Sequence, residues 1–184
     1  MVLKVFGFGG ARRIAGVFLV TAIAIAFAIP HASAATTNIV ALGASNTAGK
    51  GVSSGEAWPA RLEVMLRAKG YDVAVTNAGI SGDDTSGMLA RASAAVPNGT
   101  QIVILDKAAS NDQLRHINTS ANIAAIAAQL HARGIKTIVI DGMHAWAKNQ
   151  LQADGIHITA AGHEAVAARL LPLVIAAIGK PGAK

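Results

Sequence analysis

The chain has 184 residues, a formal net charge of +6 and no cysteine, which excludes disulfides, a cysteine nucleophile and thiolate metal sites. Removing the first 34 residues, which carry three of the positive charges, leaves a net charge of only +3. No block of Lys and Arg with interleaved aromatic residues is present, so the composition does not indicate a nucleic-acid surface.

Residues 1–34 have the pattern of a secretory signal peptide. A positively charged leader precedes an apolar run over residues 14–29, Pro30 ends that run, and Ala32-Ser33-Ala34 has the small-residue spacing of a cleavage site. The alternative is an uncleaved anchor helix, but the run is shorter than the roughly 20 residues that span a bilayer. We therefore expect one mature domain over residues 35–184, no stable membrane anchor after cleavage, and export to the periplasm or medium.

Short apolar runs and segments with helical spacing alternate along the rest of the chain. In chain order they predict a strand at 39–42, a helix at 58–69, a strand at 73–75, a helix at 86–95, a strand at 102–105, a helix at 117–133, a strand at 135–140 and a helix from Thr159 to Ile178. Pro172 is expected to kink or interrupt the last helix, because proline lacks the N–H that the helix needs.

The predicted strands are apolar without interruption, which is typical of a parallel sheet covered by helices on both faces. Ligand sites in such α/β folds lie beyond the carboxyl ends of the strands. Chemistry is therefore expected in the segments after Leu42, Asn77 and Leu105. Asp106 and Lys107, directly after the third strand, are expected to pair with each other.

A serine follows the first predicted strand. Ser45 lies in the segment 43–49, which is rich in small residues. A serine between a strand and a helix exposes its hydroxyl near the positive end of a helix dipole. The segment is not the G-x-S-x-G elbow, because Thr47 stands where the second glycine should be. On its own the pattern also fits a tight turn.

Loops after the second and third strands offer hydrogen-bond donors. The loop 77–85 contains two glycines that let the backbone approach a ligand, and the N–H of Gly82 could face an oxyanion. Asn111 offers an uncharged amide donor, which suits an oxyanion hole. The alternatives are a flexible loop in which Asp83 or Asp84 caps a helix, and an ordinary turn or cap at the asparagine.

An aspartate and a histidine lie three residues apart after the fourth strand. Asp154, on a turn with Gly155, can reach Nδ1 of His157 and leave Nε2 to accept a serine proton. Two surface polar residues are the alternative. A metal site of His144, His157 and His163 is disfavoured, because the spacing of the last two is not that of helical ligands and no carboxylate pair accompanies them.

Taken together, these segments resemble the SGNH or GDSL hydrolases, particularly their bacterial periplasmic thioesterase/lysophospholipase and arylesterase branch. The resemblance spans residues 39–173 and is most specific at 77–83 and 154–159. It implies a flavodoxin-like three-layer α/β/α fold with a parallel sheet of about four to five strands. It also implies hydrolysis of a small-molecule acyl ester without a metal or another cofactor.

The resemblance also assigns roles to five residues. Ser45 is the nucleophile and first oxyanion donor, Gly82 supplies a backbone donor, and Asn111 supplies a side-chain donor. Asp154 orients His157, which is the general base. The expected function is that of a serine esterase acting through an acyl-enzyme.

Three departures from the family pattern affect this expectation. Ala44 stands where the family usually has an acidic residue, and Ala109 stands where it has a glycine. The segment 142–153 is too short for the helix and strand that relatives place there. We expect four core strands and a shallow site that prefers short acyl groups such as acetyl or butyryl. The alternative function is a secreted, non-catalytic binding domain on the same scaffold; the oligomeric state stays open.

Overall fold

The computed structural model describes residues 36–179, and the expected signal peptide over residues 1–34 lies outside them. In the described part, four parallel strands form one sheet in the order β2-β1-β3-β4. The strands are β1 (Thr37–Gly43), β2 (Val73–Gly79), β3 (Thr100–Asp106) and β4 (Lys136–Ile140). The predicted parallel sheet is therefore confirmed, with each strand found where the sequence predicts it.

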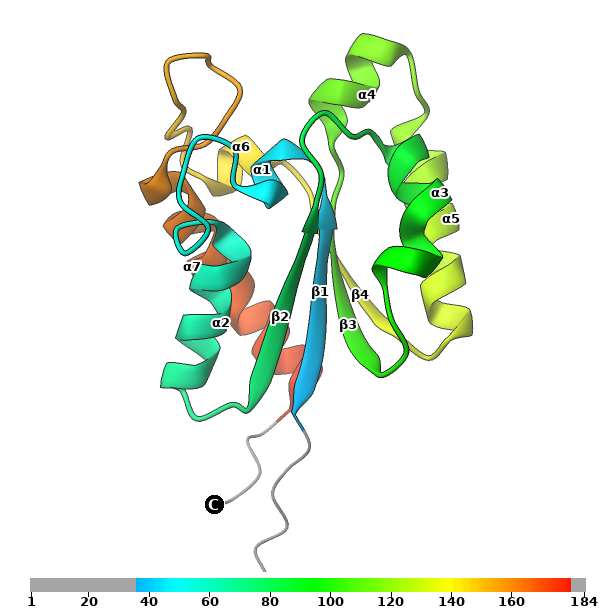
Figure 1. Cartoon of the computed structure of the whole chain (residues 1–184), viewed down its shortest axis with the longest axis vertical. Helices are drawn as coiled ribbons and strands as arrows, with labels where there is room; N and C mark the ends of the chain where they lie inside the picture. Colours follow the sequence, from blue (N-terminus) through cyan, green and yellow to red (C-terminus); the bar gives the residue numbers. More distant parts are fainter. Residues whose placement is uncertain (1–35, 180–184) are drawn as a thin grey trace, which may run out of the picture. The chain divides into compact units, whose positions relative to one another are not determined.

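Four longer helices cover the sheet on both faces (Figure 1). They are α2 (Trp58–Ala68), α3 (Thr85–Ala95), α5 (Thr119–Ala132) and α7 (Ala160–Ile178). Helices α2 and α7 pack on one face, and α3 and α5 pack on the other. The fold is the expected three-layer α/β/α arrangement.

The two central strands explain why both faces need cover. Successive side chains of a strand point to opposite faces. Ile39 and Ala41 of β1 pack in the core beneath α2 and α7, whereas Val40 and Leu42 pack in the core beneath α3 and α5. All four side chains are almost completely buried. Alternate residues of one uninterrupted apolar run therefore contribute to two separate hydrophobic cores, one on each face of the sheet.

Three short helices lie at the carboxyl edge of the sheet (Figure 1). They are α1 (Ser45–Ala48), α4 (Ala109–Arg115) and α6 (Met143–Trp146). They follow β1, β3 and β4, respectively. This edge also carries the candidate catalytic residues, as expected for a sheet of this type.

The last helix runs from Ala160 to Ile178 through Pro172, so of the expected kink or interruption the interruption is wrong. A proline inside a helix costs about 3 kcal/mol. Burial of Val166, Leu170 and Val174 in the core offsets this cost, because each such side chain contributes about 1.5–3 kcal/mol. By length and composition α7 could also cross a membrane, but these side chains pack as those of a core helix do.

The chain between β4 and α7 is short, as the sequence predicts. In the described residues it contains α6 and one antiparallel bridge between Leu151 and Ile158, but no fifth strand. β4 therefore forms one edge of the sheet, and its residues Thr137, Ile138 and Val139 are only partly buried.

A fully buried histidine links α7 to the start of α2. The Nδ1 atom of His163 accepts a hydrogen bond from the N–H of Trp58 at 3.1 Å, and its Nε2 has no partner among the residues described. Burial lowers the pKa of His163 to about 4, against the weaker opposing effect of Glu56. Protonation is therefore easier in the unfolded chain, and the native state should lose stability in acid.

We expect the free energy of unfolding to fall as the pH decreases from about 6.5 towards 4. The contribution of His163 is present above pH 6.5 and decreases by up to about 3 kcal/mol at the acid end, because one pKa unit corresponds to about 1.4 kcal/mol. Urea denaturation of wild type and of His163→Asn at pH 4.5 and 7 measures this pH-dependent contribution to the free energy of unfolding. The variant keeps an acceptor without an ionisable ring; the exposed His116→Asn is the control. An equal pH dependence in all three proteins would contradict the prediction.

Candidate active site

Ser45 begins α1 directly beyond the end of β1, and its side chain is partly exposed. Two glycines permit the tight packing of this turn. A Cβ atom on Gly43 would lie 2.7 Å from Cβ of Asp106, and one on Gly79 would lie 2.7 Å from the carbonyl carbon of Thr47. Real Cβ atoms do not approach other atoms so closely. The hydroxyl-bearing turn therefore packs directly against the ends of β2 and β3.

The structure brings Ser45, His157 and Asp154 into line. Oγ of Ser45 lies 3.0 Å from Nε2 of His157, and Nδ1 of the same ring lies 2.5 Å from Oδ2 of Asp154. Because the carboxylate is an acceptor, Nδ1 donates to it, and Nε2 of the neutral ring accepts from the serine hydroxyl. A hydroxyl, an imidazole and a carboxylate in this order can move a proton from serine to histidine.

The Asp154 turn is held by its own backbone. The other oxygen of the carboxylate, Oδ1, accepts hydrogen bonds from the N–H groups of Ile156 and His157, each at 2.9 Å. The hydrogen bond from the His157 ring, followed by these two amide bonds, holds the pKa of Asp154 well below its usual range. The carboxylate is therefore ionised whenever the imidazole is neutral, which orients the ring.

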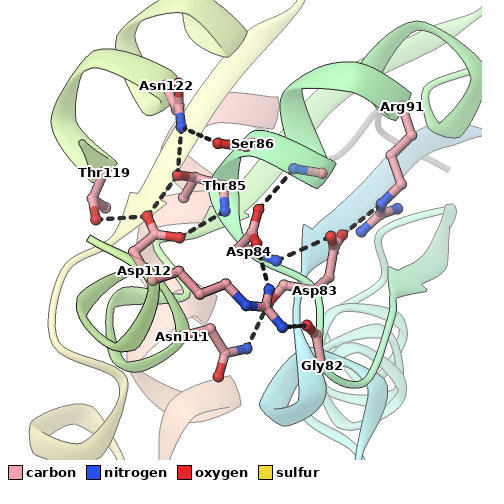
Figure 2. A network of polar contacts seen from close by, with 12 residues as sticks. Gly82, Asp83, Asp84, Thr85, Ser86, Arg91, Asn111, Asp112, Thr119 and Asn122 are labelled. Carbon is pink, nitrogen blue, oxygen red and sulfur yellow. Dashed lines mark hydrogen bonds and ion pairs between the residues drawn. The ribbon is translucent and has the colours of Figure 1, made fainter. Parts of the chain in front are cut away.

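Asn111 contacts the loop between β2 and α3, which contains Gly82. Asn111 lies in α4, and its Nδ2 donates to the carbonyl of Asp83 at 2.5 Å (Figure 2). Gly82 adopts a φ of +83°, which favours glycine, and its carbonyl accepts a hydrogen bond of 3.0 Å from Arg115. The asparagine amide and the glycine loop are thus joined by direct contacts.

A buried carboxylate fixes the same loop from the other side. Asp112 is fully buried and accepts hydrogen bonds from the N–H and hydroxyl of Thr85 at 2.8 and 2.5 Å and from the hydroxyl of Thr119 at 2.6 Å (Figure 2). These bonds tie α4 to the start of α3 and α5. Arg91 adds hydrogen bonds to Asp83 and to the carbonyls at the ends of β1 and β2. The loop is therefore anchored on both sides by hydrogen bonds within the protein.

Comparison with known families decides where this chain belongs. Residues 41–145, more than half of the chain, match the profile of the GDSL-like Lipase/Acylhydrolase family. The chain belongs to this family. The match covers the segments of Ser45, Gly82 and Asn111.

Two curated relatives are similar over part of their length. Esterase TesA of Pseudomonas aeruginosa is 32% identical over 110 residues, which are 58% of this chain and 55% of that protein. An arylesterase of Vibrio mimicus is 36% identical over 89 residues, which are 48% of this chain and 44% of that protein. The chain thus spans about half the length of the curated relatives that it matches.

Solved structures share the GDSL-like fold. A crystal structure of TesA superposes with a TM-score of 0.65 at 24% identity, covering 77% of this chain and 99% of that one. A point mutant of esterase AlinE4 gives a TM-score of 0.53 at 32% identity, covering 58% of this chain and 59% of the other. AlinE4 itself, described as an SGNH-hydrolase family esterase, gives 0.56 at 24% identity, with 80% and 100% covered.

In this GDSL-like chain, two further residues hold the loop of His157. The sequence did not suggest this contact for either of them. Asn46 accepts a hydrogen bond from the N–H of Ile158 at 3.0 Å and donates to the carbonyl of Ile156 at 3.3 Å. Nε2 of His144 donates to the same carbonyl at 2.8 Å. The position of Asn46 next to the serine is the only signal that could have suggested this contact. His144 lies in the shortened segment, where no pattern indicates a partner.

The three histidines considered as metal ligands serve three different contacts. His144 bonds to a backbone carbonyl, His157 to Ser45, and His163 to the backbone of Trp58. The described part of the chain contains no cluster of three His, Asp or Glu side chains that could hold a metal. The structure therefore does not bring these histidines together.

A cavity of about 250 Å³ opens beside Ser45 on the β3–β4 side of the GDSL-like site. Its lining includes Ser45, Asn111, Lys107, Met143, His144 and Ile156. Gly82 does not line it and is connected to it only through the contact of Asn111 with the loop. Most of the wall comes from residues 106–111, which join the end of β3 to the start of α4, and from residues 140–144 at and after the end of β4.

The expected pairing of Asp106 with Lys107 is wrong. Nζ of Lys107 lies 2.8 Å from the exposed carboxylate of Asp141, across from β3 at the end of β4. Asp106 is instead buried, and it accepts a hydrogen bond from the hydroxyl of Thr47 at 3.1 Å. Asp106 is the last residue of β3 and its side chain is buried, whereas the side chain of the next residue, Lys107, reaches the exposed Asp141, so the two do not meet.

Proposed function

We propose that this protein is a serine-dependent carboxylic ester hydrolase that acts through an acyl-enzyme, on short-chain esters of the arylesterase, thioesterase or lysophospholipase type. The observation that carries the proposal is the aligned contact of Ser45 with His157 at 3.0 Å and of His157 with Asp154 at 2.5 Å. Membership of the GDSL-like family and the esterase names of its relatives support it.

In the proposed reaction His157 removes the proton from Ser45 as the hydroxyl oxygen attacks the ester carbonyl. Asp154 stabilises the imidazolium that results and keeps the ring in the productive orientation. The imidazolium then protonates the leaving alcohol or thiol, and an acyl-enzyme forms. A water molecule, deprotonated by the same histidine, releases the acid and restores the free serine.

The proposed oxyanion donors are the N–H groups of Ser45 and Gly82 and the amide of Asn111. A side-chain amide carries two N–H bonds. One of those in Asn111 is used by the carbonyl of Asp83, so the second stays available for a substrate oxygen in the cavity. Loss of one such donor typically lowers kcat about 10²–10³-fold.

The proposal extends to the location of the protein. The leader, apolar run and small-residue site of residues 1–34 support a signal peptide, so that the mature domain begins at residue 35 and acts outside the cytoplasm. The partner is a small acyl ester, and the mature charge of +3 does not suggest nucleic acid.

A fluorophosphonate probe tests the proposal directly, because it phosphonylates an activated serine and releases fluoride. The mature protein should be labelled stoichiometrically, and mass spectrometry of its peptides should find the label on Ser45. Prior incubation with a hydrolysable ester should slow labelling by competition. A folded protein that neither reacts with the probe nor hydrolyses any ester would contradict the proposal and favour the non-catalytic binding domain.

A preference for short acyl chains is expected from the size of the cavity. Pockets for drug-sized ligands usually measure about 300–1,000 Å³, and the cavity here is about 250 Å³. A buried methylene contributes about 0.8 kcal/mol, or roughly fourfold in kcat/KM. Beyond about four carbons we expect less than twofold per added carbon. The measurement is kcat/KM for p-nitrophenyl esters of two to twelve carbons below their micelle concentrations. A continued fourfold rise per methylene would contradict it.

A further inference from the structure

Asp106 is a buried carboxylate that the proposed mechanism does not use. It is the last residue of β3 and only 5% exposed, and it lies against the cavity beside Ser45. Burial raises the pKa of its carboxyl group above the ordinary value, against the opposing effect of its hydrogen bonds. A carboxyl group in such a place is costly unless its oxygens have partners.

Three donors from two different segments satisfy this carboxyl group. The hydroxyl of Thr47 donates to Oδ2 at 3.1 Å, and the N–H of Ala108 donates to Oδ1 at 3.2 Å. The N–H of Ala44 donates to the same carboxyl group. Ala44 and Thr47 flank Ser45 on both sides, and Ala108 directly precedes α4, the helix that carries Asn111.

The surrounding backbone is built to leave room for this side chain. A methyl group on Gly43 would lie 2.7 Å from Cβ of Asp106 and 2.8 Å from Cβ of Thr47, so only glycine fits there. Thr47 is completely buried. Ala108 has a φ of +49°, a region that residues other than glycine rarely adopt, and its N–H is turned towards the carboxylate.

We propose that Asp106 is a positioning residue. It holds the turn around Ser45 and helix α4, which carries Asn111, in a fixed position relative to each other. The inference rests on the proposed function, since it concerns the same site. The carboxylate touches neither substrate nor reacting atoms; it acts through Ala44, Thr47 and Ala108. Its removal should therefore disturb the distance between the attacking oxygen and the oxyanion donor.

The substitution Asp106→Asn tests this with almost no change in volume. An amide has only one oxygen, so it cannot accept all three donors, and its NH₂ group faces donors instead of acceptors. We expect kcat on a short p-nitrophenyl ester to fall about 10–100-fold while KM changes less than about threefold, because misplaced reacting groups lose rate rather than ground-state binding. Thr47→Val, which removes one of the three donors, should give a smaller loss in the same direction.

A second variant, which loses stability without touching the serine turn, separates the positioning role from a merely structural one. Val174→Ala truncates a fully buried side chain of α7 in the core between the sheet and helices α2 and α7, far from the serine turn in sequence. It should lower the melting temperature yet leave kcat within about twofold of wild type when measured well below that temperature. If Val174→Ala loses kcat as Asp106→Asn does, or if Asp106→Asn is folded and retains kcat within about threefold, the proposal is overturned.

A second readout does not need turnover. Amide hydrogen exchange of the folded protein should show protection at Ala44 and Ala108 in wild type, and that protection should fall at least about tenfold in Asp106→Asn but not in Val174→Ala. Absence of ester hydrolysis in wild type would defeat the proposed function, while this exchange comparison would still decide whether Asp106 orders both segments. Unchanged protection at both amides would overturn the positioning role.

Discussion

Ser45→Ala is expected to reduce ester hydrolysis about 10⁴–10⁶-fold, to the residual rate that binding and the oxyanion donors alone provide. The variant loses the attacking oxygen and one hydrogen bond of 3.0 Å to His157, on a residue that is only partly buried. Its fold and melting temperature should therefore change little. The measurement is kcat/KM on p-nitrophenyl acetate or butyrate, together with fluorophosphonate labelling and circular dichroism.

Ser93→Ala, an exposed change on α3, is the matched control and should behave as wild type. The outcome that would defeat the assignment is labelling that persists in Ser45→Ala. A label that maps to Ser81 or Ser110 in that variant would name a different nucleophile. Retained hydrolysis without any label would point to contamination or to chemistry without a serine.

Asp154→Asn is expected to lower kcat about 10²–10⁴-fold with little effect on KM. The Asp154 carboxylate now accepts from Nδ1 of His157 at 2.5 Å and so keeps Nε2 free for the serine proton. An amide can instead donate to Nδ1, which stabilises the tautomer with the proton on Nε2. That ring cannot accept the proton from Ser45.

Asp154→Asn keeps the hydrogen bonds that hold the turn, so it tests the tautomer of the His157 ring rather than the folding of the loop. The amide oxygen can still accept from the N–H groups of Ile156 and His157, which hold the turn. Asp72→Asn, an exposed change whose carboxylate bonds only to the hydroxyl of Thr36 among the described residues, is the control. Full activity in Asp154→Asn would show that the Asp-x-x-His turn has no part in the reaction.

The sequence predicts the regular elements well because their signals are local. The first three strand cores are apolar runs bounded by glycine or polar residues, and the fourth has such a run at 138–140. The observed strands differ from the predicted ones by only a few residues at their ends. The three short helices were not predicted as helices. Segments of four to seven residues are too short to show a helical period. Helix α4 also begins after Ala108 at positive φ, which no propensity suggests.

In the candidate site too, contacts between residues close in sequence could be predicted from local patterns, and contacts between distant residues could not. The contact of Asp154 with His157 spans three residues, so a local pattern is enough to predict that they meet. The contact of Ser45 with His157 joins residues 112 apart in sequence, and the resemblance to a known family, not spacing, placed them together. The catalytic roles of these residues, and of Gly82 and Asn111, remain predictions that the experiments above test.

The alternation of strands and helices, the parallel three-layer fold and the candidate catalytic residues could all be predicted from the amino-acid sequence. These follow from burial patterns along a few residues and from short motifs. The groups that hold the candidate catalytic residues became visible in the folded chain: Asn46 and His144 contact the His157 loop, and Asp106 contacts the serine turn. Such partners come from strands and loops far apart in the chain, and a single polar residue carries no periodic signal. Its neighbours are decided by sheet order and packing, which exist only once the chain has folded.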